Sequence, residues 1–275
     1  MQILHSVSEL RSRLEREKAI AFVPTMGNLH EGHIELVRIA REKGSCVVVS
    51  IFVNPIQFGP NEDFDKYPRT LEADCARLQG LADVVFAPSV EEMYPEQQTM
   101  FVEPPPIAKE LCGEFRPGHF QGVATVVLKL FNLVRPQVAI FGRKDYQQLA
   151  IIRQMVSQFN LPIAIVGAEI LRASDGLALS SRNQYLSDTE RTEAVFLSRT
   201  LYELRESLTS GKRGYKELEQ DAAAVLTGRG WVVEYVAIRN QSNLGIPDAG
   251  ERKLVILAAA RLGKTRLIDN LEISL

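Results

Sequence analysis

Short apolar runs alternate with segments of helical periodicity over the first two thirds of the chain. Runs rich in β-branched residues predict buried strands at 19–24, 45–53, 83–88, 137–142 and 163–171. Apolar residues recur at helical spacing in the segments between them and predict helices at 32–44, 70–80, 122–134 and 144–159. This alternation indicates βαβ units, and therefore an α/β fold with a Rossmann-like parallel sheet and helices on both of its faces.

The pattern changes near residue 175. A polar loop at 175–187 precedes a long amphipathic helix that we expect over 188–210, and Ser187 and Glu190 form a capping-box pattern before it. Beyond it, the pattern predicts a helix at 214–227 and strands at 231–239 and 253–260. We therefore expect a smaller α+β C-terminal domain, with the first domain over 1–174 and the second over 175–275.

Composition removes several classes of protein. The 275 residues are 45% hydrophobic and carry a formal net charge of −2, which excludes a disordered chain and gives no general field that would attract nucleic acid. The N-terminal segment turns charged too soon for a secretory signal, and no stretch is apolar for long enough to cross a bilayer. We expect a cytoplasmic protein with neither nucleic acid nor membrane as a partner.

The three cysteines are Cys46, Cys75 and Cys112, an odd number without CxxC spacing. This suits a reducing compartment and argues against a disulfide framework and a zinc site. Cys46 lies inside an apolar run, where a small core residue is the plain interpretation.

The segment PTMGNLHEGH, residues 24–33, joins a predicted strand to a predicted helix. That junction is the carboxyl edge of a parallel sheet, where ligands bind. Gly27 permits a tight turn, and the N-terminus of the following helix favours anions such as phosphate. His30 and His33 lie three residues apart, on one side of the first turn, where they can donate hydrogen bonds to phosphate oxygens.

Two alternatives compete for these histidines: surface side chains that only cap the helix, or ligands of zinc. A third zinc ligand in fitting arrangement is missing nearby in the sequence. The H-x-G-H spacing after a strand and a glycine turn is similar to the signature of the nucleotidyl-transferase superfamily, which includes class I aminoacyl-tRNA synthetases. That similarity implies ATP-dependent activation of a carboxylate or transfer of an adenylyl group.

Two further segments have the chemistry of a phosphate site. GRKDYQQ, residues 142–148, follows a predicted strand, so Lys144 can lie beside phosphates, and Gln148 shares its helix face four residues later. LSSRN, residues 179–183, offers two hydroxyl groups and a guanidinium for the leaving pyrophosphate. Taken alone, Lys144 could equally be a solvated charge and the serine-rich loop an ordinary turn.

A site for an acceptor is predicted where the strand over 45–53 ends. Asn54 and Gln57 follow that strand, and their uncharged amides suit a small polyhydroxy acid. The charged stretch NEDFDKYPR, residues 61–69, suits a mobile flap, although its Arg69 could equally be solvated. Arg116 and His119 flank a Pro-Gly turn that could be structural or could belong to the site.

The whole chain resembles the pantoate–β-alanine ligase family. The segments that carry the resemblance occur in order: PTMGNLHEGH, SIFVNPIQFGPNEDFDKYPRT, RPGHFQGVATVVLKLFN, GRKDYQQ and RASDGLALSSRNQYLS. The resemblance implies that ATP and pantoate form pantoyl-adenylate and pyrophosphate, and that β-alanine then attacks the adenylate to give pantothenate and AMP. It also implies magnesium between the phosphates, a C-terminal lid and a homodimer.

The resemblance also assigns roles to residues. His33 is marked in the family as the proton donor, and we expect His30 and Lys144 to act with it in catalysis. Gln57 and Gln148 would bind pantoate, with Gln57 also near β-alanine. Residues implied to bind ATP are Met26, Gly27, Asn28, Leu29, His30, Glu31, Gly32, His33, Gly142, Arg143, Lys144, Asp145, Leu171, Leu179, Ser180, Ser181 and Arg182. Arg143 departs from the family, which commonly has an acidic residue at this place.

Two rival functions fit parts of this pattern. An adenylyl- or cytidylyltransferase with a phosphorylated acceptor would need more cationic residues than Asn54, Gln57 and Gln148 supply. A non-catalytic nucleotide sensor need not retain His30, His33 and Lys144 together. His5 and Trp231 lie outside every motif, and we assign them structural roles.

Overall fold

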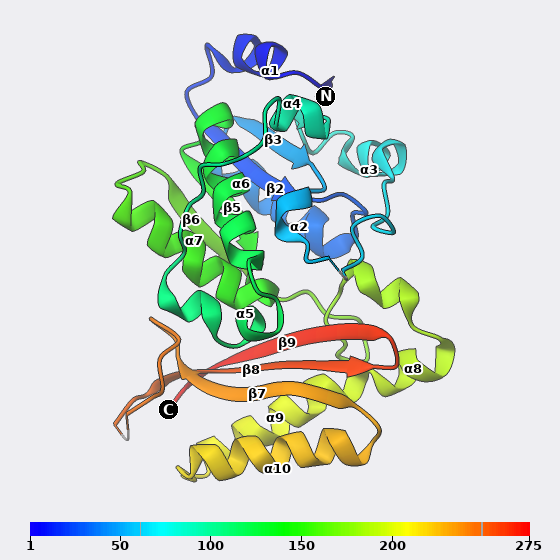
Figure 1. Cartoon of the computed structure of the whole chain (residues 1–275), viewed down its shortest axis with the longest axis vertical. Helices are drawn as coiled ribbons and strands as arrows, with labels where there is room; N and C mark the ends of the chain where they lie inside the picture. The colour runs from blue at the N-terminus through cyan, green and yellow to red at the C-terminus, as the bar shows by residue number, and fades with distance from the viewer. Residues whose placement is uncertain (61, 249) are drawn as a thin grey trace.

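The computed structural model describes residues 1–60, 62–248 and 250–275 and contains two sheets. The larger sheet is parallel throughout and has the order β1-β4-β3-β2-β5-β6. Its strands are β1 (Gln2–Leu4), β2 (Ile20–Thr25), β3 (Cys46–Ile51), β4 (Val84–Phe86), β5 (Val138–Gly142) and β6 (Ala164–Ala168). The predicted Rossmann-like parallel sheet is confirmed, with each expected strand in its place (Figure 1).

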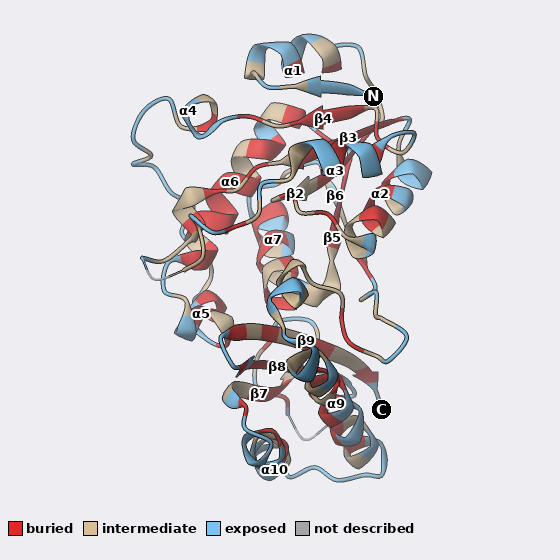
Figure 2. Ribbon diagram, turned by 90° about the vertical axis from the view of Figure 1, so that its right-hand side faces the viewer, coloured by how far each residue is buried: buried red, intermediate tan, exposed pale blue. Residues whose placement is uncertain are grey.

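Helices cover both faces of this sheet because side chains alternate between the faces along each strand. In β2, Ile20 and Phe22 face a core formed with the helices α1 (Val7–Leu14), α6 (His119–Val134) and α7 (Tyr146–Gln158). Ala21 and Val23 face the opposite core, formed with α2 (Glu31–Lys43) and α3 (Leu71–Leu78). Figure 2 shows the central strands buried between these two layers. Burial on both faces explains why the strands appear in the sequence as continuous apolar runs.

The C-terminal part has an antiparallel sheet of β7 (Val232–Asn240), β8 (Lys253–Leu262) and β9 (Thr265–Ser274). One face packs on α9 (Val195–Thr209) and α10 (Tyr215–Gly228) around buried Trp231. The other face packs on the N-terminal part, where Val255 and Leu257 meet Leu111 and Tyr146 (Figure 1). The second sheet therefore lies between its own helices and the first domain. The position of the domain boundary stays a prediction.

Two differences from the expected elements, in α8 (Asp188–Glu193) and α9 and in β9, have physical causes. The helix expected over 188–210 is two helices, α8 and α9, with a bend at Ala194 that lets Glu193 bind Arg229 and Trp231. The strand β9 was not predicted, because Asp269 and Asn270 interrupt its alternation of apolar residues. The sequence pattern also missed β1 and α1.

The remaining short helices are α4 (Val90–Met93) and α5 (Cys112–Phe115) and the 3₁₀ turns η1 (Pro55–Gln57), η2 (Pro106–Lys109), η3 (Arg143–Asp145) and η4 (Ser181–Tyr185). Over the described ranges, the helices are too short or too polar to cross a bilayer.

The helix α6 approaches η1 very closely, and Gly122 makes this possible. A Cβ atom at Gly122 would lie 2.3 Å from the carbonyl oxygen of Ile56 and 2.6 Å from the Cα atom of Gln57. Both distances are shorter than real Cβ contacts, so a larger residue would force the helix and the turn apart. The position of η1, and of Gln57 within it, therefore depends on Gly122, which has no Cβ atom.

We expect Gly122→Ala to destabilise the protein by about 1–3 kcal/mol, since the added methyl group must displace backbone atoms. The matched control is Gly228→Ala at the end of α10, where an added Cβ meets nothing within 4 Å. Urea unfolding of both variants measures the difference. Equal stabilities for the two variants would show that η1 tolerates the methyl group.

Candidate active site

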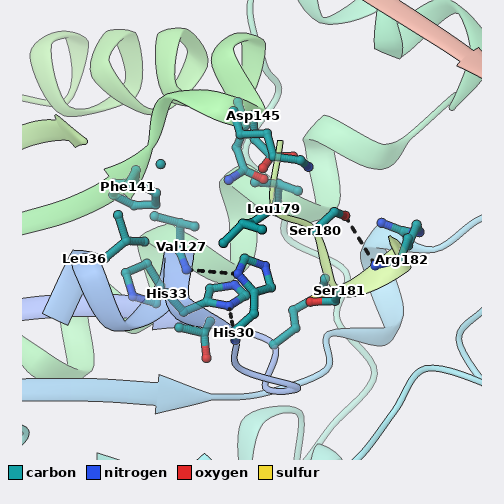
Figure 3. Close-up of a pocket in the computed structure, with 18 of the residues that line it drawn as sticks. His30, His33, Leu36, Val127, Phe141, Asp145, Leu179, Ser180, Ser181 and Arg182 are labelled. Atoms are coloured by element: carbon teal, nitrogen blue, oxygen red, sulfur yellow. Dashed lines mark hydrogen bonds between the residues drawn. The ribbon is translucent and has the colours of Figure 1, made fainter. Parts of the chain in front are cut away.

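A pocket opens where the strands β2, β3, β5 and β6 end, and segments from both halves of the chain line it. It lies at the carboxyl edge of the parallel sheet, where the sequence placed the ligand. Of the predicted site residues, the lining includes Met26, His30, Gly32, His33, Asn54, Gln57, Gly142, Lys144, Asp145, Gln148, Leu171, Leu179, Ser180, Ser181 and Arg182. The fold thus gathers residues that are up to 156 positions apart, from Met26 to Arg182, around one space (Figure 3).

Five of the predicted ATP-binding residues lie beside the pocket rather than on its wall. Gly27, Asn28 and Leu29 form the turn behind the histidines, and Glu31 pairs with Arg38 at 2.7 Å. Arg143 binds Glu169 at 2.6 Å and Glu272 of β9 at 2.8 Å. Its charge therefore joins the two sheets. Whether these five residues contact a nucleotide stays a prediction.

The turn before α2 is held by Asp74, a residue that sequence analysis did not select. Gly27 and Asn28 have φ angles of +80° and +51°, so the chain reverses sharply there. The reversal points two backbone amides at one carboxylate: Asn28 donates to Asp74 Oδ2 at 3.0 Å and Leu29 donates to Oδ1 at 2.7 Å. Asp74 is 2% exposed. A buried carboxylate with several hydrogen bonds fixes the loop that presents the histidines.

The histidine pair caps α2 with its own ring nitrogens. Gly32 N–H donates to His30 Nδ1 at 3.1 Å, and His30 N–H donates to His33 Nδ1 at 3.3 Å. Since each Nδ1 accepts, the proton of each neutral ring must be on Nε2. The rings lie 4.1 Å apart between centroids, beside Leu179 in Figure 3. Capping thus sets the tautomer and leaves an N–H donor on each ring.

Both rings are neutral at physiological pH. Burial lowers the pKa of His30 to about 4, and the charge of Lys144 contributes. Burial also lowers the pKa of His33 to about 3, with a further contribution from His30. Burial in a low-dielectric pocket disfavours the charged imidazolium. These residues can therefore donate hydrogen bonds to an anion while carrying no net charge.

The charged side chains of the pocket are Lys144, Asp145, Glu169 and Arg182 among the lining residues described. Lys144 and Asp145 belong to η3, the turn that follows β5. Asp145 is exposed at the pocket; desolvation by the surrounding protein works to raise its pKa, but the positive charges of Lys144 and Arg182 outweigh it and lower that pKa below its usual value. Asp145 is therefore an ionised carboxylate beside two cations.

The loop at 180–182 closes one side of the pocket against the N-terminal domain. Ser181 Oγ donates to the carbonyl oxygen of Asn28 at 3.2 Å, and Ser180 caps η4. Arg182 pairs with Asp63 at 3.1 Å, which brings the loop against the predicted flap. Asn61, the first residue of that flap, lies outside the described residues. Leu179 N–H donates to Leu171 O at 2.9 Å, so the two ends of the 171–179 excursion are joined.

An amide network fixes the orientation of Gln57. Asn54 is 1% exposed, and its Nδ2 donates to Gly122 O at 3.3 Å and to Gln57 Oε1 at 3.0 Å, while Tyr94 donates to its Oδ1 at 2.7 Å. A carbonyl can only accept, so Gly122 settles which end of Asn54 is nitrogen. Gln57 therefore presents Nε2 near Met26 Sδ at 3.2 Å. The structure favours a positioning role for Asn54, whose amide already has partners, and leaves a donor on Gln57.

A second chain of contacts holds the backbone of Gln57. Arg116 donates to both oxygens of Glu62 at 2.6 and 2.7 Å and to His119 Nε2 at 2.8 Å. His119 Nδ1–H then donates to the carbonyl oxygen of Gln57 at 2.9 Å. Burial lowers the pKa of His119 to about 4, and Arg116 adds to this, so the ring is neutral. Arg116 and His119, which flank the Pro-Gly turn, therefore hold the backbone of Gln57 in place.

Apolar side chains form a further part of the pocket wall. They come mainly from one face of α6, with additions from β5 and the segment after β3: Val123, Val126, Val127, Leu130, Phe141 and Phe52. The surface that they present is uncharged. A ligand bound there must have an apolar part next to its polar groups.

Three residues assigned elsewhere in the sequence lie off the pocket wall. Arg69 stacks over Phe64 within the flap, His5 contacts Ala87 O on the surface, and Trp231 is buried in the C-terminal core.

Asp74 could have been found from the sequence, because it occupies the i+3 position of the apolar stripe Leu71-Asp74-Cys75-Leu78. An acidic residue on such a stripe signals a buried partner.

The described residues contain no cluster of three or more His, Cys, Asp or Glu side chains that could hold a metal ion. His30 and His33 therefore belong to no such cluster within those ranges. Their Nδ1 atoms are also already committed to backbone N–H groups.

Sequence comparison connects this pocket to known proteins. The family model for pantoate-β-alanine ligase matches residues 2–272. A pantothenate synthetase from Methylobacillus flagellatus is 57% identical over 275 residues, covering 100% of this chain and 99% of the relative. The pantothenate synthetase of a serogroup C strain of Neisseria meningitidis is 58% identical over 278 residues, covering 100% of both chains.

Solved structures agree with these relatives. Pantothenate synthetase from Thermus thermophilus superposes with a TM-score of 0.95 at 45% identity and covers 100% of both chains. The pantoate-β-alanine ligase from Francisella tularensis, described as complexed with "Beta-gamma ATP" and β-alanine, gives a TM-score of 0.80 at 35% identity and covers 98% of this chain and 97% of its own. Since the family model spans nearly the whole sequence and similar relatives cover all of it, the chain belongs to the pantoate–β-alanine ligase family of enzymes.

Proposed function

We propose that this enzyme makes pantothenate in two steps within the pocket described above. ATP and pantoate first give pantoyl-adenylate and pyrophosphate, and β-alanine then displaces AMP. Family membership supports the overall product, and the complex of the Francisella relative supports ATP and β-alanine as substrates. The residues of the pocket support the division of the reaction into these steps.

The triphosphate lies, in this proposal, between the histidine pair and the 180–182 loop. The N-terminus of α2 faces the pocket there and favours negative charge. His30 and His33 offer Nε2–H donors, and Lys144 and Arg182 supply positive charge from two other elements. Donors fixed before the reaction begins stabilise the charge that builds on phosphoryl oxygens.

Pantoate fits the opposite side of the pocket. It has a carboxylate and two hydroxyl groups, and also a quaternary carbon with two methyl groups. The free donor of Gln57 and the amide of Gln148 can bind the hydroxyl groups, while the α6 wall packs on the methyl groups. A phosphorylated acceptor, as in the rival transferases, would leave its charge against that apolar wall.

The first step requires no general base. The pantoate carboxylate is already ionised at neutral pH and attacks the α-phosphorus, forming a C–O–P bond as the bond to pyrophosphate breaks. The barrier comes from bringing two anions together and from charge on the phosphoryl oxygens. Positioning by Gln57 and donation by His30, His33 and Lys144 act on both contributions.

In the second step the amine of β-alanine attacks the acyl carbon, and AMP leaves with the electrons of the broken bond. The amine must lose a proton, which passes to the leaving phosphate group or to water, because neither His30 nor His33 has an unpaired ring nitrogen to accept it. The resemblance marks His33 as a proton donor. Because its pKa is about 3, we propose that His33 donates a hydrogen bond and retains its proton.

Magnesium fits this pocket as a companion of ATP. The described lining supplies the carboxylates Asp145 and Glu169 without a three-ligand cluster, which suits an ion held mainly by phosphates. Asp145 is the residue that would complete its shell. Such an ion neutralises phosphate charge and orients the triphosphate. The homodimer and the cytoplasmic location stay predictions.

The observation that carries this proposal is a single pocket with neutral imidazole donors on one side and an amide beside an apolar wall on the other. A protein that only senses a nucleotide does not need the amide and the apolar wall. A product assay tests it directly, because pantothenate, AMP and pyrophosphate should form together only when ATP, pantoate and β-alanine are all present. Formation of ADP in place of AMP would refute the adenylate route.

We expect His33→Ala to slow adenylate formation by about a hundredfold, because one preorganised donor to the phosphoryl group is lost. Pantoate-dependent exchange of pyrophosphate into ATP measures this step alone. The control is His5→Ala, which removes an exposed histidine whose ring contacts Ala87 O, away from the pocket. Near-normal exchange in His33→Ala would remove the donor role.

Gln57→Ala should raise the KM for pantoate by about tenfold and change that for ATP by less than about twofold. The loss of a hydrogen bond to a substrate hydroxyl costs about 1–1.5 kcal/mol, which corresponds to that factor. Steady-state kinetics with each substrate varied in turn provide the measurement. Equal effects on both KM values would place Gln57 outside the acceptor pocket.

Folding stability should fall as the pH is lowered from about 6.5 to about 5. Unfolded imidazoles take up protons near their ordinary pKa of 6.5, whereas His30, His33 and His119 stay neutral in the folded protein down to about 4, 3 and 4. The unfolded state therefore binds more protons in this range, and acid favours it. Urea unfolding at several pH values measures the slope.

The variant His119→Gln isolates one of these contributions. It removes one titrating ring, so its slope should be shallower by up to about 1.4 kcal/mol per pH unit. A slope identical to that of the unmodified protein would mean that His119 is protonated in the folded state.

A further inference from the structure

Two adjacent polar residues, Asp269 and Asn270, are buried in the middle of β9. They are 3% and 4% exposed, and no motif in the sequence points to them. Consecutive side chains in a strand point to opposite faces of the sheet. Asp269 therefore faces the α9 side with Leu267 and Ile273, and Asn270 faces the N-terminal domain. A buried polar group costs free energy unless it has a hydrogen-bond partner, so the partners of Asp269 and Asn270 indicate what these two side chains do.

Asn270 reaches across to η3 and binds both sides of one residue. Its Nδ2 donates to Arg143 O at 2.8 Å and to Lys144 O at 2.9 Å. These two carbonyl groups belong to the peptide units on either side of the Lys144 Cα atom, and each unit is planar. A single amide thus fixes both backbone dihedral angles of Lys144, and with them the direction in which its side chain leaves the backbone.

Asp269, on the other face of the sheet, binds the 171–179 excursion through Arg172. Arg172 donates to both its oxygens at 2.7 and 2.8 Å, a two-bond geometry that orients the guanidinium. Arg172 also donates to Gly176 O at 3.0 Å and pairs through its backbone with Ala178. The 171–179 excursion, which carries Leu171 and Leu179 to the pocket, is therefore fastened to β9.

From these contacts we propose that Asp269 and Asn270 are positioning residues for ATP, which together hold the Lys144 turn and the 171–179 loop at a fixed separation. The proposal rests on the nucleotide site proposed above. The strand β9 contacts both η3, which contains Lys144, and η4, which follows the 171–179 loop. Part of the ATP site is therefore built by the C-terminal sheet, although neither Asp269 nor Asn270 lines the pocket.

The effect of these residues should be specific to the nucleotide. Without the Asn270 amide, the Lys144 turn loses two hydrogen bonds to its carbonyl groups and can adopt more than one arrangement, so Lys144 meets the phosphates less often. The pantoate side rests on Gln57, Asn54 and α6, which Asn270 does not contact. Binding of β-alanine and pantoate should change little.

The test is Asn270→Ala in the full-length protein. We expect the KM for ATP and the dissociation constant of a non-hydrolysable ATP analogue to rise by about tenfold, while the KM values for pantoate and β-alanine change by less than about twofold. Calorimetric titration of the analogue needs no turnover, so it tests the positioning role even if the products of the reaction differ from those proposed.

The matched control is Gln241→Ala. Gln241 Nε2 also donates to two carbonyl oxygens in the same sheet, those of Leu254 at 2.8 Å and Ile273 at 3.2 Å, away from the nucleotide loops. It should lower thermal stability by a similar amount and leave ATP binding unchanged. An equal loss of ATP binding in both variants, or equal rises in all three KM values, would reduce Asn270 to a structural role and overturn the proposal.

A double-mutant cycle shows whether Asn270 acts through Lys144. If it does, Asn270→Ala should weaken analogue binding in the unmodified protein but add less than about twofold in a Lys144→Ala background. Full additivity of the two losses of analogue binding would overturn the proposal.

If Asn270→Ala does not fold, Asn270→Ser retains one donor and should give a smaller, still ATP-specific effect. Wild-type ATP binding in folded Asn270→Ser would also overturn the proposal.

Discussion

The pocket depends on how the N-terminus of one helix satisfies its free N–H groups. In α2 the acceptors are two imidazole Nδ1 atoms, where other helices of this chain use serine hydroxyls. Because each ring nitrogen accepts, its proton must lie on the opposite nitrogen. The same hydrogen bonds that begin the helix therefore aim two neutral donors at the pocket. Burial then keeps both rings uncharged, since it disfavours imidazolium.

This arrangement requires rigid support, and buried polar residues supply it from several elements. Asp74 on α3 holds the turn before the histidines, and Asn54 holds Gln57. On the other side, Asp269 and Asn270 hold the loops that carry Leu171 and Lys144. In each case a buried side chain binds backbone or a charged partner, so its desolvation is offset and a loop is fixed. Catalytic side chains of the proposed reaction thus rest on groups that no substrate touches.

Both parts of the chain provide this support, because residues of the C-terminal sheet hold loops of the N-terminal part. The face of this sheet toward the N-terminal domain packs on Leu111 and Tyr146, and from that face Asn270 reaches the Lys144 turn. Arg143 pairs with Glu169 and Glu272, so its charge lies between the segment after β6 and the strand β9, where both partners are acidic.

Sequence patterns predict every strand of the parallel sheet except β1, the helices between them and the segments that meet at the sheet edge, because periodicity, glycine turns and local motifs act over a few residues. Residue types and spacing also point to His30, His33, Lys144 and Gln57 as candidates. The tertiary structure was needed for the ring tautomers, for the hydrogen bonds of Asn54, and for Asp74, Asp269 and Asn270 behind the site. Those features depend on hydrogen bonds between residues that are distant in sequence, such as the 126 positions between Lys144 and Asn270. A local pattern contains no record of such a partner, and in β9 the two polar residues concealed the strand itself.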